Sequence, residues 1–167
     1  MNCNTSFFTR LAPNEMKKRN AVFVILYSSD FEGNLANKKV LMSFRWNNQF
    51  GFVGGIMEAN ESFHETIKRE VLEETGFLMT PAHINKTEFL CSHFYQEKEM
   101  GIHVYTCEIS ITEMKHILSS WFLASDAAYE VAGMCAVNTL LPERLLENRF
   151  AASGKEELNL FLNKFCH

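Results

Sequence analysis

The pattern of apolar and polar positions predicts a chain in which strands alternate with helices. Residues 21–28 are a continuous apolar run of strand length, which is typical of a strand buried on both faces. A charged turn separates two further runs of strand composition, so these two are expected to form a hairpin. The other expected strands, together with the two of the hairpin, lie at residues 39–45, 49–53, 86–95, 101–109 and 131–137.

Three segments carry apolar residues at helical spacing. In the first, Glu61 and Ser62 provide a polar start, an apolar residue recurs every four positions, and Gly76 is a natural C-terminal stop. Groups of strands followed by a helix predict an α/β fold, in which a mixed β-sheet is sandwiched between α-helices. The three expected helices, the second capped by Thr112, span residues 61–76, 111–122 and 153–165.

Length and composition bound the domain organisation. The chain has 167 residues, of which 47 % are hydrophobic, and this supports one domain with a sizeable core rather than two. We therefore expect a single domain over residues 1–167, with residues 1–18 flexible and a loop at residues 29–38. The five cysteines are odd in number and show no close pairing, which indicates free or buried thiols in a reducing compartment.

Charge and hydropathy exclude several classes of protein. No apolar run approaches the roughly 18 residues of a membrane span, and the N-terminus lacks the apolar core of a secretory signal. The formal net charge of −4 argues against a large nucleic-acid footprint. These features predict a soluble cytoplasmic protein, or a nuclear one in a eukaryote, with no DNA partner and no membrane association.

One face of the first expected helix is acidic. At about 3.6 residues per turn, Glu70, Glu73 and Glu74 share this face. Glu70 and Glu74 have no Lys or Arg at helical spacing, so a like-charge pair stands there without a cation. A solvated acidic face is the plain alternative, but Gly54 and Gly55 precede the helix and allow close approach and carbonyl coordination. Oxygen ligands of this kind suit Mg²⁺ or Mn²⁺ rather than Zn²⁺.

The same segment carries a longer pattern of fixed spacing. Gly55 is followed six residues later by Glu61, and Arg-Glu-Val-Leu-Glu-Glu-Thr-Gly-Phe follows at residues 69–77. With this pattern the chain resembles the Nudix hydrolases, whose signature it matches without substitution, and a single Nudix hydrolase domain is implied. Arg69 lies where its side chain can bind Glu65 or Glu61 and fix the preceding loop onto the helix. The signature, the Nudix box, spans residues 55–77, and its structural residues are Gly55, Glu61, Arg69 and Gly76.

The rest of the chain resembles one branch of this superfamily, the snoRNA-decapping and inosine-diphosphate phosphatase type. The resemblance implies a Mg²⁺ or Mn²⁺ cofactor, a purine nucleotide substrate and a homodimer. The segments that carry it are residues 19–27, Arg45 with Phe-Gly-Phe-Val-Gly-Gly at residues 50–55, Ser92-His93, residues 126–133 and residues 146–150.

Carried over to this chain, the resemblance implies two groups of site residues. At Phe23 the family has a histidine that touches the purine base; a phenyl ring can stack on a base but cannot hydrogen-bond to its edge. Glu157 stands where the family also admits glutamine. The implied metal group is the Gly54 carbonyl with Glu70, Glu73, Glu74, His93 and Glu157, and the implied substrate group is Phe23, Arg45, Phe52, Gly55 and Glu157.

The candidate chemistry is hydrolysis of a phosphoanhydride bond. Divalent cations on the glutamates would neutralise the phosphate oxygens and lower the pKa of a bound water molecule. A carboxylate would then accept the proton of this water. Spacing leaves Glu73, Glu74 and Glu130 as alternatives for this general base, and the catalytic candidates altogether are Glu70, Glu73, Glu74 and Glu130.

Several functions share such a site. We expect hydrolysis of purine nucleoside di- or triphosphates of the inosine or guanosine type, with m7G-capped RNA as an additional substrate. The alternatives are decapping of mRNA or snoRNA as the main role, and an ADP-ribose-type dinucleotide pyrophosphatase. An inactive binding module is least favoured, because such modules lose the box glutamates that this chain keeps. The acidic balance favours small nucleotides, since RNA affinity draws on Lys and Arg.

Overall fold

The computed structural model describes residues 8–13, 15–29, 38–127 and 129–166, and within them the strands form one eight-stranded sheet. Its main path runs β1-β6-β7-β2-β3-β4, while β5 pairs with β2 and β8 pairs with β3. The pairing of β2 with β7 is parallel and the other described pairings are antiparallel, so the sheet is mixed as predicted. The strands are β1 Phe8–Arg10, β2 Arg19–Ser28, β3 Lys39–Arg45, β4 Phe50–Gly51, β5 Val53–Ile56, β6 Glu88–Tyr95, β7 Met100–Glu108 and β8 Val131–Asn138.

The sheet forks along β2. This strand pairs with β5 over residues 21–24, but it pairs with β3 only at Tyr27 and Ser28. β3 continues instead with β4 and β8. β5 and the end of β3 therefore diverge, which places Gly54 on one branch of the sheet and Arg45 on the other.

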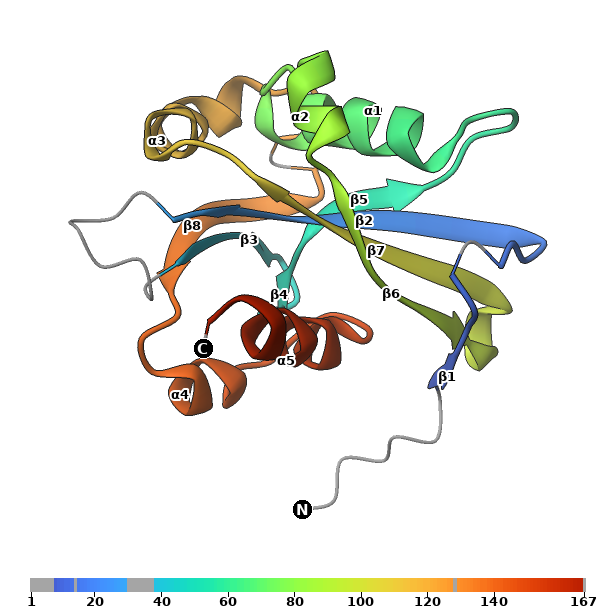
Figure 1. The fold of residues 1–167 in the computed structure, drawn as a ribbon. Helices are drawn as coiled ribbons and strands as arrows, with labels where there is room; N and C mark the ends of the chain where they lie inside the picture. The colour runs from blue at the N-terminus through green and yellow to red at the C-terminus, as the bar shows by residue number, and fades with distance from the viewer. Residues whose placement is uncertain (1–7, 14, 30–37, 128, 167) are drawn as a thin grey trace.

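Helices cover both faces of the sheet (Figure 1), which confirms the predicted sandwich. α1, α2 and α3 lie on one face, where Val71 of α1 and Val22 of β2 belong to the same core cluster. α4 and α5 lie on the other face, where Phe161 of α5 and Ile25 of β2 belong to a second cluster. The helices are α1 Phe63–Thr75, α2 Pro81–Asn85, α3 Ile111–Ser120, α4 Pro142–Leu146 and α5 Gly154–Phe165, with 3-10 turns η2 Gln96–Lys98 and η3 Trp121–Leu123.

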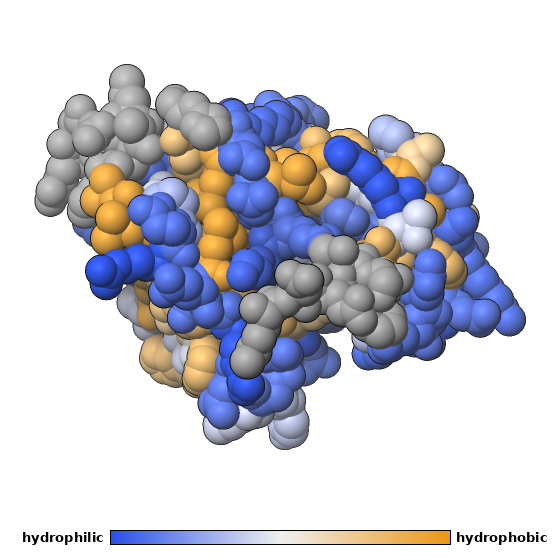
Figure 2. All heavy atoms as spheres, turned by 90° about the horizontal axis from the view of Figure 1, so that it is seen from below, coloured by the Kyte–Doolittle hydropathy of each residue, from blue (hydrophilic) through white to orange (hydrophobic). Residues whose placement is uncertain are grey.

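The surface on the side of α4 and α5 is largely hydrophilic, and apolar side chains reach it in separate patches (Figure 2). None of the described helices is long and apolar enough to cross a membrane. The cysteines of the described residues are free, as expected; Cys3 lies outside these residues.

The predicted elements are confirmed to within a few residues, with two local differences. The segment at residues 49–53 is not one strand but parts of two, β4 and β5, so Gly54 and Gly55 lie inside a strand. The predicted cap of the second long helix, Thr112, is wrong: Ser110 is the N-cap and accepts a hydrogen bond from the backbone N–H of Glu113. Both residue types favour this position, and the turn geometry selects the earlier one.

Short elements escaped the periodicity analysis. α2 and α4 have five residues each, and β1 has three, which is too few for a repeating apolar pattern to show. We expected residues 1–18 to be flexible, but Phe8–Arg10 form β1 and pair antiparallel with β6. Residues 1–7 and 14, and residues 30–37 of the expected loop, lie outside the described residues.

α1, the helix of the Nudix box, is defined by its two ends. The Ser62 side chain accepts a hydrogen bond from the backbone N–H of Glu65, and the Glu65 carboxylate accepts one from the backbone N–H of Ser62, which makes a capping box. At the other end Gly76 has φ 71°, a left-handed conformation, and donates its N–H to the carbonyl of Leu72. A side chain at this position would cost about 1 kcal/mol or more, so glycine ends the helix at low cost.

A series of buried, hydrogen-bonded polar side chains links β6, β7 and β2 beneath α1. The imidazole of His103 is fully buried, with Nδ1 2.8 Å from Ser92 Oγ and Nε2 3.1 Å from Asn20 Oδ1. Asn20 in turn holds the backbone of Lys17 through Oδ1 and Nδ2. Burial lowers the pKa of His103 to about 4, so this ring stays neutral in the folded protein while the same ring in the unfolded chain titrates near its ordinary value.

This difference predicts a loss of stability in acid. Below pH 6.5, the pKa of the ring in the unfolded chain, His103 binds a proton when the chain is unfolded but not when it is folded. The free energy of unfolding therefore falls as the pH is lowered from about 6.5 to 4. We expect His103 to account for about 2 kcal/mol of the loss between pH 7 and pH 5. Urea unfolding of wild type and His103→Gln at both pH values measures this. The exposed His116→Gln is the control, and an unchanged pH slope in His103→Gln would contradict the prediction.

Candidate active site

The acidic face of α1 packs against β5, the strand that carries the paired glycines. Glu70 and Glu74 are both buried at this contact. A Cβ atom at Gly55 would overlap the carboxyl group of Glu70. Gly54 has φ 144°, and a Cβ atom there would collide with the carbonyl of Val22 in β2. The two glycines therefore let the carboxylates of α1 approach the backbone of β5.

Arg69 connects the box loop to the acidic face. Its Nε lies 2.8 Å from Glu61 Oε1, and its Nη1 lies 2.8 Å from Glu70 Oε1 and 2.9 Å from Glu73 Oε2. Nη2 donates to the carbonyl of Ile56 at the end of β5. The hydrogen bond from Arg69 is the largest of the effects that lower the pKa of Glu61 to about 2. This guanidinium thus fixes loop, strand and helix together.

These contacts refine two expectations about Arg69. Of the two partners expected, Glu61 is confirmed, whereas Glu65 is engaged by Ser62 in the capping box. Helical spacing also left Glu70 without a cation, but the neighbouring Arg69 bends back to reach it. Of the three glutamates on the acidic face, Glu74 is the one for which no cation lies within ion-pair distance in the described part of the chain.

Glu74 carries an incompletely satisfied carboxylate. Its Oε1 accepts a hydrogen bond from the backbone N–H of Gly54 at 3.3 Å, whereas its Oε2 is buried and has no hydrogen-bond partner. Burial raises the pKa of Glu74 to about 8, and the negative charges of Glu70 and Glu130 add to the rise. Burial also raises the pKa of Glu70. Unpaired buried charge of this kind is costly unless something in the working protein binds it.

A divalent cation of the Mg²⁺ type fits this donor set. Carboxylate oxygens and backbone carbonyl oxygens are the hard ligands that such an ion prefers, and the buried Glu74 Oε2 has no hydrogen-bond partner and is free to act as a ligand. In the described residues, no three His, Cys, Asp or Glu side chains already converge as a complete cage. An ion of this kind normally keeps several water ligands and so needs only one or two carboxylates.

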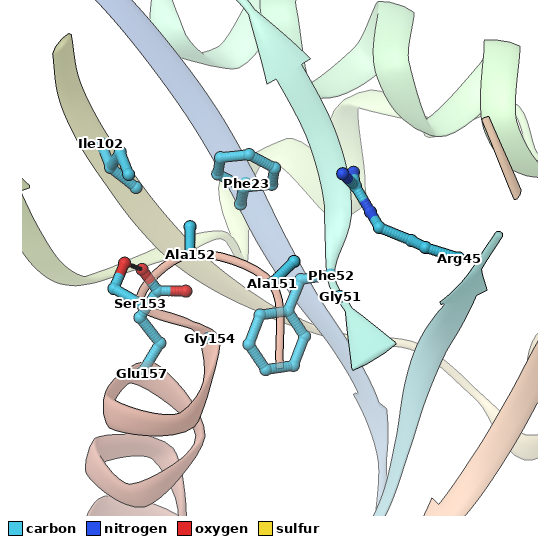
Figure 3. Close-up of a pocket in the computed structure, with 10 residues that line it drawn as sticks. All are labelled: Phe23, Arg45, Gly51, Phe52, Ile102, Ala151, Ala152, Ser153, Gly154 and Glu157. Atoms are coloured by element: carbon cyan, nitrogen blue, oxygen red, sulfur yellow. Dashed lines mark hydrogen bonds between the residues drawn. The ribbon is translucent and has the colours of Figure 1, made fainter. Parts of the chain in front are cut away.

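A pocket lies on the α5 side of the fork (Figure 3). Phe23, Phe52 and Ile102 form its apolar wall, and Glu157 of α5 faces in from one end. Its cavity volume of about 60 Å³ is far below the roughly 300–1,000 Å³ of a complete ligand pocket. It therefore suits only one part of a larger ligand.

Arg45 links this pocket to the acidic face. It lines the pocket, and its positive charge is among the effects that lower the pKa of Glu74. Its Nε is buried and has no hydrogen-bond partner. An ideal Cβ atom at Gly51 would stand 3.1 Å from this Nε, so glycine leaves room for the guanidinium. Arg45 also pairs in register with Val131, which brings the exposed Glu130 to the same edge.

Glu157 belongs to the pocket rather than to the box. The residue is 3 % exposed and accepts a hydrogen bond from Ser153 Oγ. Burial raises its pKa to about 7. None of the contacts in the described structure joins it to Glu70 or Glu74, so its position supports the substrate group, not the metal group.

His93 lies apart from the other candidates. It is a buried residue of β6 in register with Ile102 of β7, and its Nε2 has no hydrogen-bond partner. β7 and β2 separate β6 from β5, a distance of roughly 14 Å at about 4.8 Å per strand. None of the contacts in the described residues joins His93 to the glutamates of α1, so the geometry does not support its place in the metal group.

Two residues that matter to the pocket were missed from the sequence. Ser153 positions Glu157 from one turn earlier, and Gly51 makes space for Arg45. A serine four residues before a glutamate at a helix start is a usable signal for the first. For Gly51 the sequence carries no such signal, because the space depends on a side chain six positions away.

Comparison with known proteins identifies the family. A family model described as U8 snoRNA-decapping enzyme-like (Nudt16-like) matches residues 20–164. The chain belongs to this family of Nudix hydrolases. It is 29 % identical to the U8 snoRNA-decapping enzyme of Homalodisca vitripennis over 94 residues, which cover 56 % of this chain and 50 % of the relative. With the mouse U8 snoRNA-decapping enzyme it shares 26 % identity over 153 residues, which cover 84 % of this chain and 78 % of the relative.

The fold of this Nudix hydrolase is found in solved structures as well. The NUDIX domain of Shewanella oneidensis NrtR, solved in complex with ADP ribose, superposes with a TM-score of 0.62 at 17 % identity. The match covers 87 % of this chain and 86 % of the domain. It confirms the predicted Nudix fold.

The free-energy cost of burying the unpaired charge of Glu74 predicts that removing this charge stabilises the folded protein. In the folded metal-free protein the pKa of Glu74 is about 8, against 4.5 in the unfolded chain, so stability is lost as the pH rises between these values. Glu74→Gln removes the charge at nearly constant volume. We expect the metal-free variant to be more stable than wild type at pH 8 by about 1–3 kcal/mol, or roughly 2–10 °C in Tm.

Thermal unfolding in EDTA at pH 5.5 and pH 8 measures the effect. Glu73→Gln is the matched control, since Glu73 is only half-buried and paired with Arg69. Its loss should not stabilise the protein. If Glu74→Gln were less stable than wild type at both pH values, the buried charge of Glu74 would not be destabilising and the prediction would be wrong.

Proposed function

We propose that this Nudix hydrolase is a divalent-metal-dependent enzyme that cleaves the phosphoanhydride bond of purine nucleoside di- and triphosphates. The observation that carries the proposal is a pair of buried, unsatisfied atoms, Glu74 Oε2 and Arg45 Nε, on residues close enough for the charge of Arg45 to lower the pKa of Glu74. A cation would balance the first group and a phosphate oxygen the second. Mg²⁺ together with a diphosphate would satisfy both.

Glu70 and Glu74, with the carbonyl of Gly54, would hold the cation. When bound, the cation would neutralise the charge of the phosphates and activate a water molecule. Arg69 keeps Glu70 and Glu73 in place, so Glu73 supports the site while bound to this guanidinium. The residues required are therefore ordered by contacts that exist before any ligand binds, which is the arrangement that electrostatic catalysis needs.

Glu130 fits the general base best among the three alternatives. Glu73 is bound by Arg69, and Glu74 is buried and is proposed as a ligand of the cation. Glu130 is exposed, yet close enough for its charge to raise the pKa of both Glu70 and Glu74. A solvent-facing carboxylate at the edge of the site can take a proton from water and release it to bulk solvent.

The nucleoside would lie along the fork. Phe23 and Phe52 offer apolar ring surface for the purine. Gly55 would contribute indirectly, because the space that a side chain would fill there is taken by the Glu70 carboxylate. Arg45, between pocket and acidic face, would hold the phosphate next to the base. The replacement of the family histidine by Phe23 leaves stacking as the contribution of this position.

Decapping of RNA is the second candidate, and the relatives favour it. Both curated relatives described above are named U8 snoRNA-decapping enzymes. A capped RNA end contains the same purine diphosphate unit, so one site would serve both substrates. An ADP-ribose-type activity is a third candidate, because the NrtR domain was solved with ADP ribose. A homodimer and a cytoplasmic location remain predictions.

A substrate panel tests the function. With saturating Mg²⁺ or Mn²⁺, we expect hydrolysis of inosine and guanosine diphosphates and of their deoxytriphosphates to exceed that of ADP-ribose. Glu74→Gln should lower kcat at least about 100-fold, the size of one lost electrostatic stabiliser. Glu88→Gln, at an exposed position away from the box, is the control.

Two outcomes of this panel would overturn the proposal. Full turnover by Glu74→Gln would remove the metal-dependent mechanism. A kcat/KM for capped RNA far above that for free nucleotides would make decapping the main role instead.

Glu130 gives a separate prediction. Glu130→Gln should lower kcat by about 10²–10⁴-fold, the usual effect of losing a general base, while Mg²⁺ affinity measured by calorimetry stays close to that of wild type. A variant that loses Mg²⁺ binding instead would place Glu130 among the metal ligands.

A further inference from the structure

The pocket on the α5 side of the fork has an unequal distribution of polar groups. Its lining residues are glycine, alanine, isoleucine and phenylalanine, apart from Arg45, Ser153 and Glu157. Figure 3 shows the guanidinium of Arg45 on one side of the Phe23 ring and the carboxylate of Glu157 on the other. A ligand that spans the pocket would thus meet a cation at one end and a hydrogen-bond acceptor at the other.

In its ionised form the carboxylate of Glu157 can only accept hydrogen bonds. The Ser153 hydroxyl donates to Oε1, and the second oxygen points into the pocket (Figure 3). Glu157 lies in the first turn of α5, where the helix dipole favours negative charge. The residue is 3 % exposed, so solvent has little access to this carboxylate. Two donors on the ligand would therefore be bound more strongly here than in water.

We propose that Glu157 selects guanine over hypoxanthine at this site, by accepting hydrogen bonds from N1–H and the N2 amino group of the base. The inference rests on the proposed function and names its preferred substrate class, guanosine nucleotides. With the Watson–Crick edge at Glu157, the base stacks against Phe23 and Phe52 and the phosphates extend past Arg45 to the acidic face of α1.

The other purines fit this carboxylate less well. Hypoxanthine keeps N1–H but has no amino group, so one charge-assisted hydrogen bond is lost. Xanthine places a carbonyl oxygen at the same position, and adenine places a ring nitrogen lone pair against the carboxylate. The phenyl rings of Phe23 and Phe52 stack on each of these bases without distinguishing their edges. The choice among purines therefore falls to Glu157.

The test compares kcat/KM at pH 8, above the pKa of about 7 of Glu157, for guanosine, inosine and xanthosine diphosphates with wild type, Glu157→Gln and Glu156→Gln. Loss of one hydrogen bond to a charged group corresponds to about 10–100-fold, so wild type should favour guanosine over inosine by at least about 10-fold, with xanthosine poorest. In Glu157→Gln, an amide that can give one acceptor and one donor, the ratio should fall to within about 3-fold of unity. Glu156→Gln, next to it but outside the pocket lining, should keep the wild-type ratio.

The outcomes separate this inference from the function on which it rests. Equal use of guanosine and inosine by wild type would overturn the inference, and this measurement does not depend on any variant folding. An unchanged ratio in a folded Glu157→Gln protein would overturn it as well. A uniform loss of kcat with an unchanged ratio would show only a structural role for Glu157. If wild type hydrolyses none of the three nucleotides, the proposed function itself fails.

Discussion

The guanidinium of Arg69 is the contact on which the site depends. It binds Glu61 in the loop before α1, Glu70 and Glu73 on the helix, and the carbonyl of Ile56 at the end of β5. One planar cation with several donors can satisfy carboxylates in different directions at once, which a lysine ammonium does less well. Without it, three carboxylates would crowd one face of α1 with no opposing charge beside them.

Arg69 leaves one charge unbalanced. Glu74 is buried on the same face, and its second oxygen has no partner. Across the fork Arg45 carries the opposite defect, a buried donor without an acceptor. A fold that kept both groups buried for stability alone would lose free energy at each. In the proposed function a cation would bind the first group and an anionic ligand the second. The diverging strands carry Arg45 at the end of β3 and, in β5, the Gly54 backbone that donates a hydrogen bond to Glu74.

The local sequence pattern was sufficient to predict the longer helices and strands and to identify the Nudix box. Capping at Ser62, the glycine stop at Gly76 and the apolar stripe of α1 depend on residues within a few positions of one another, so spacing reveals them. The same logic failed where the signal was too short, as in β1 and α4, or where two residues competed for one role, as Ser110 and Thr112 did at the start of α3.

The sequence by itself determined the α/β sandwich, the acidic face of α1 and the chemistry that its oxygen donors permit, because these follow from periodicity and residue type. Only the tertiary structure decided which candidates meet. It set His93 three strands away from β5, turned Glu157 into the pocket beside Phe23, and brought Glu130 to the acidic face. These contacts depend on strand order and on the fork of the sheet. They join residues far apart in the chain, so no regular spacing in the sequence predicts them.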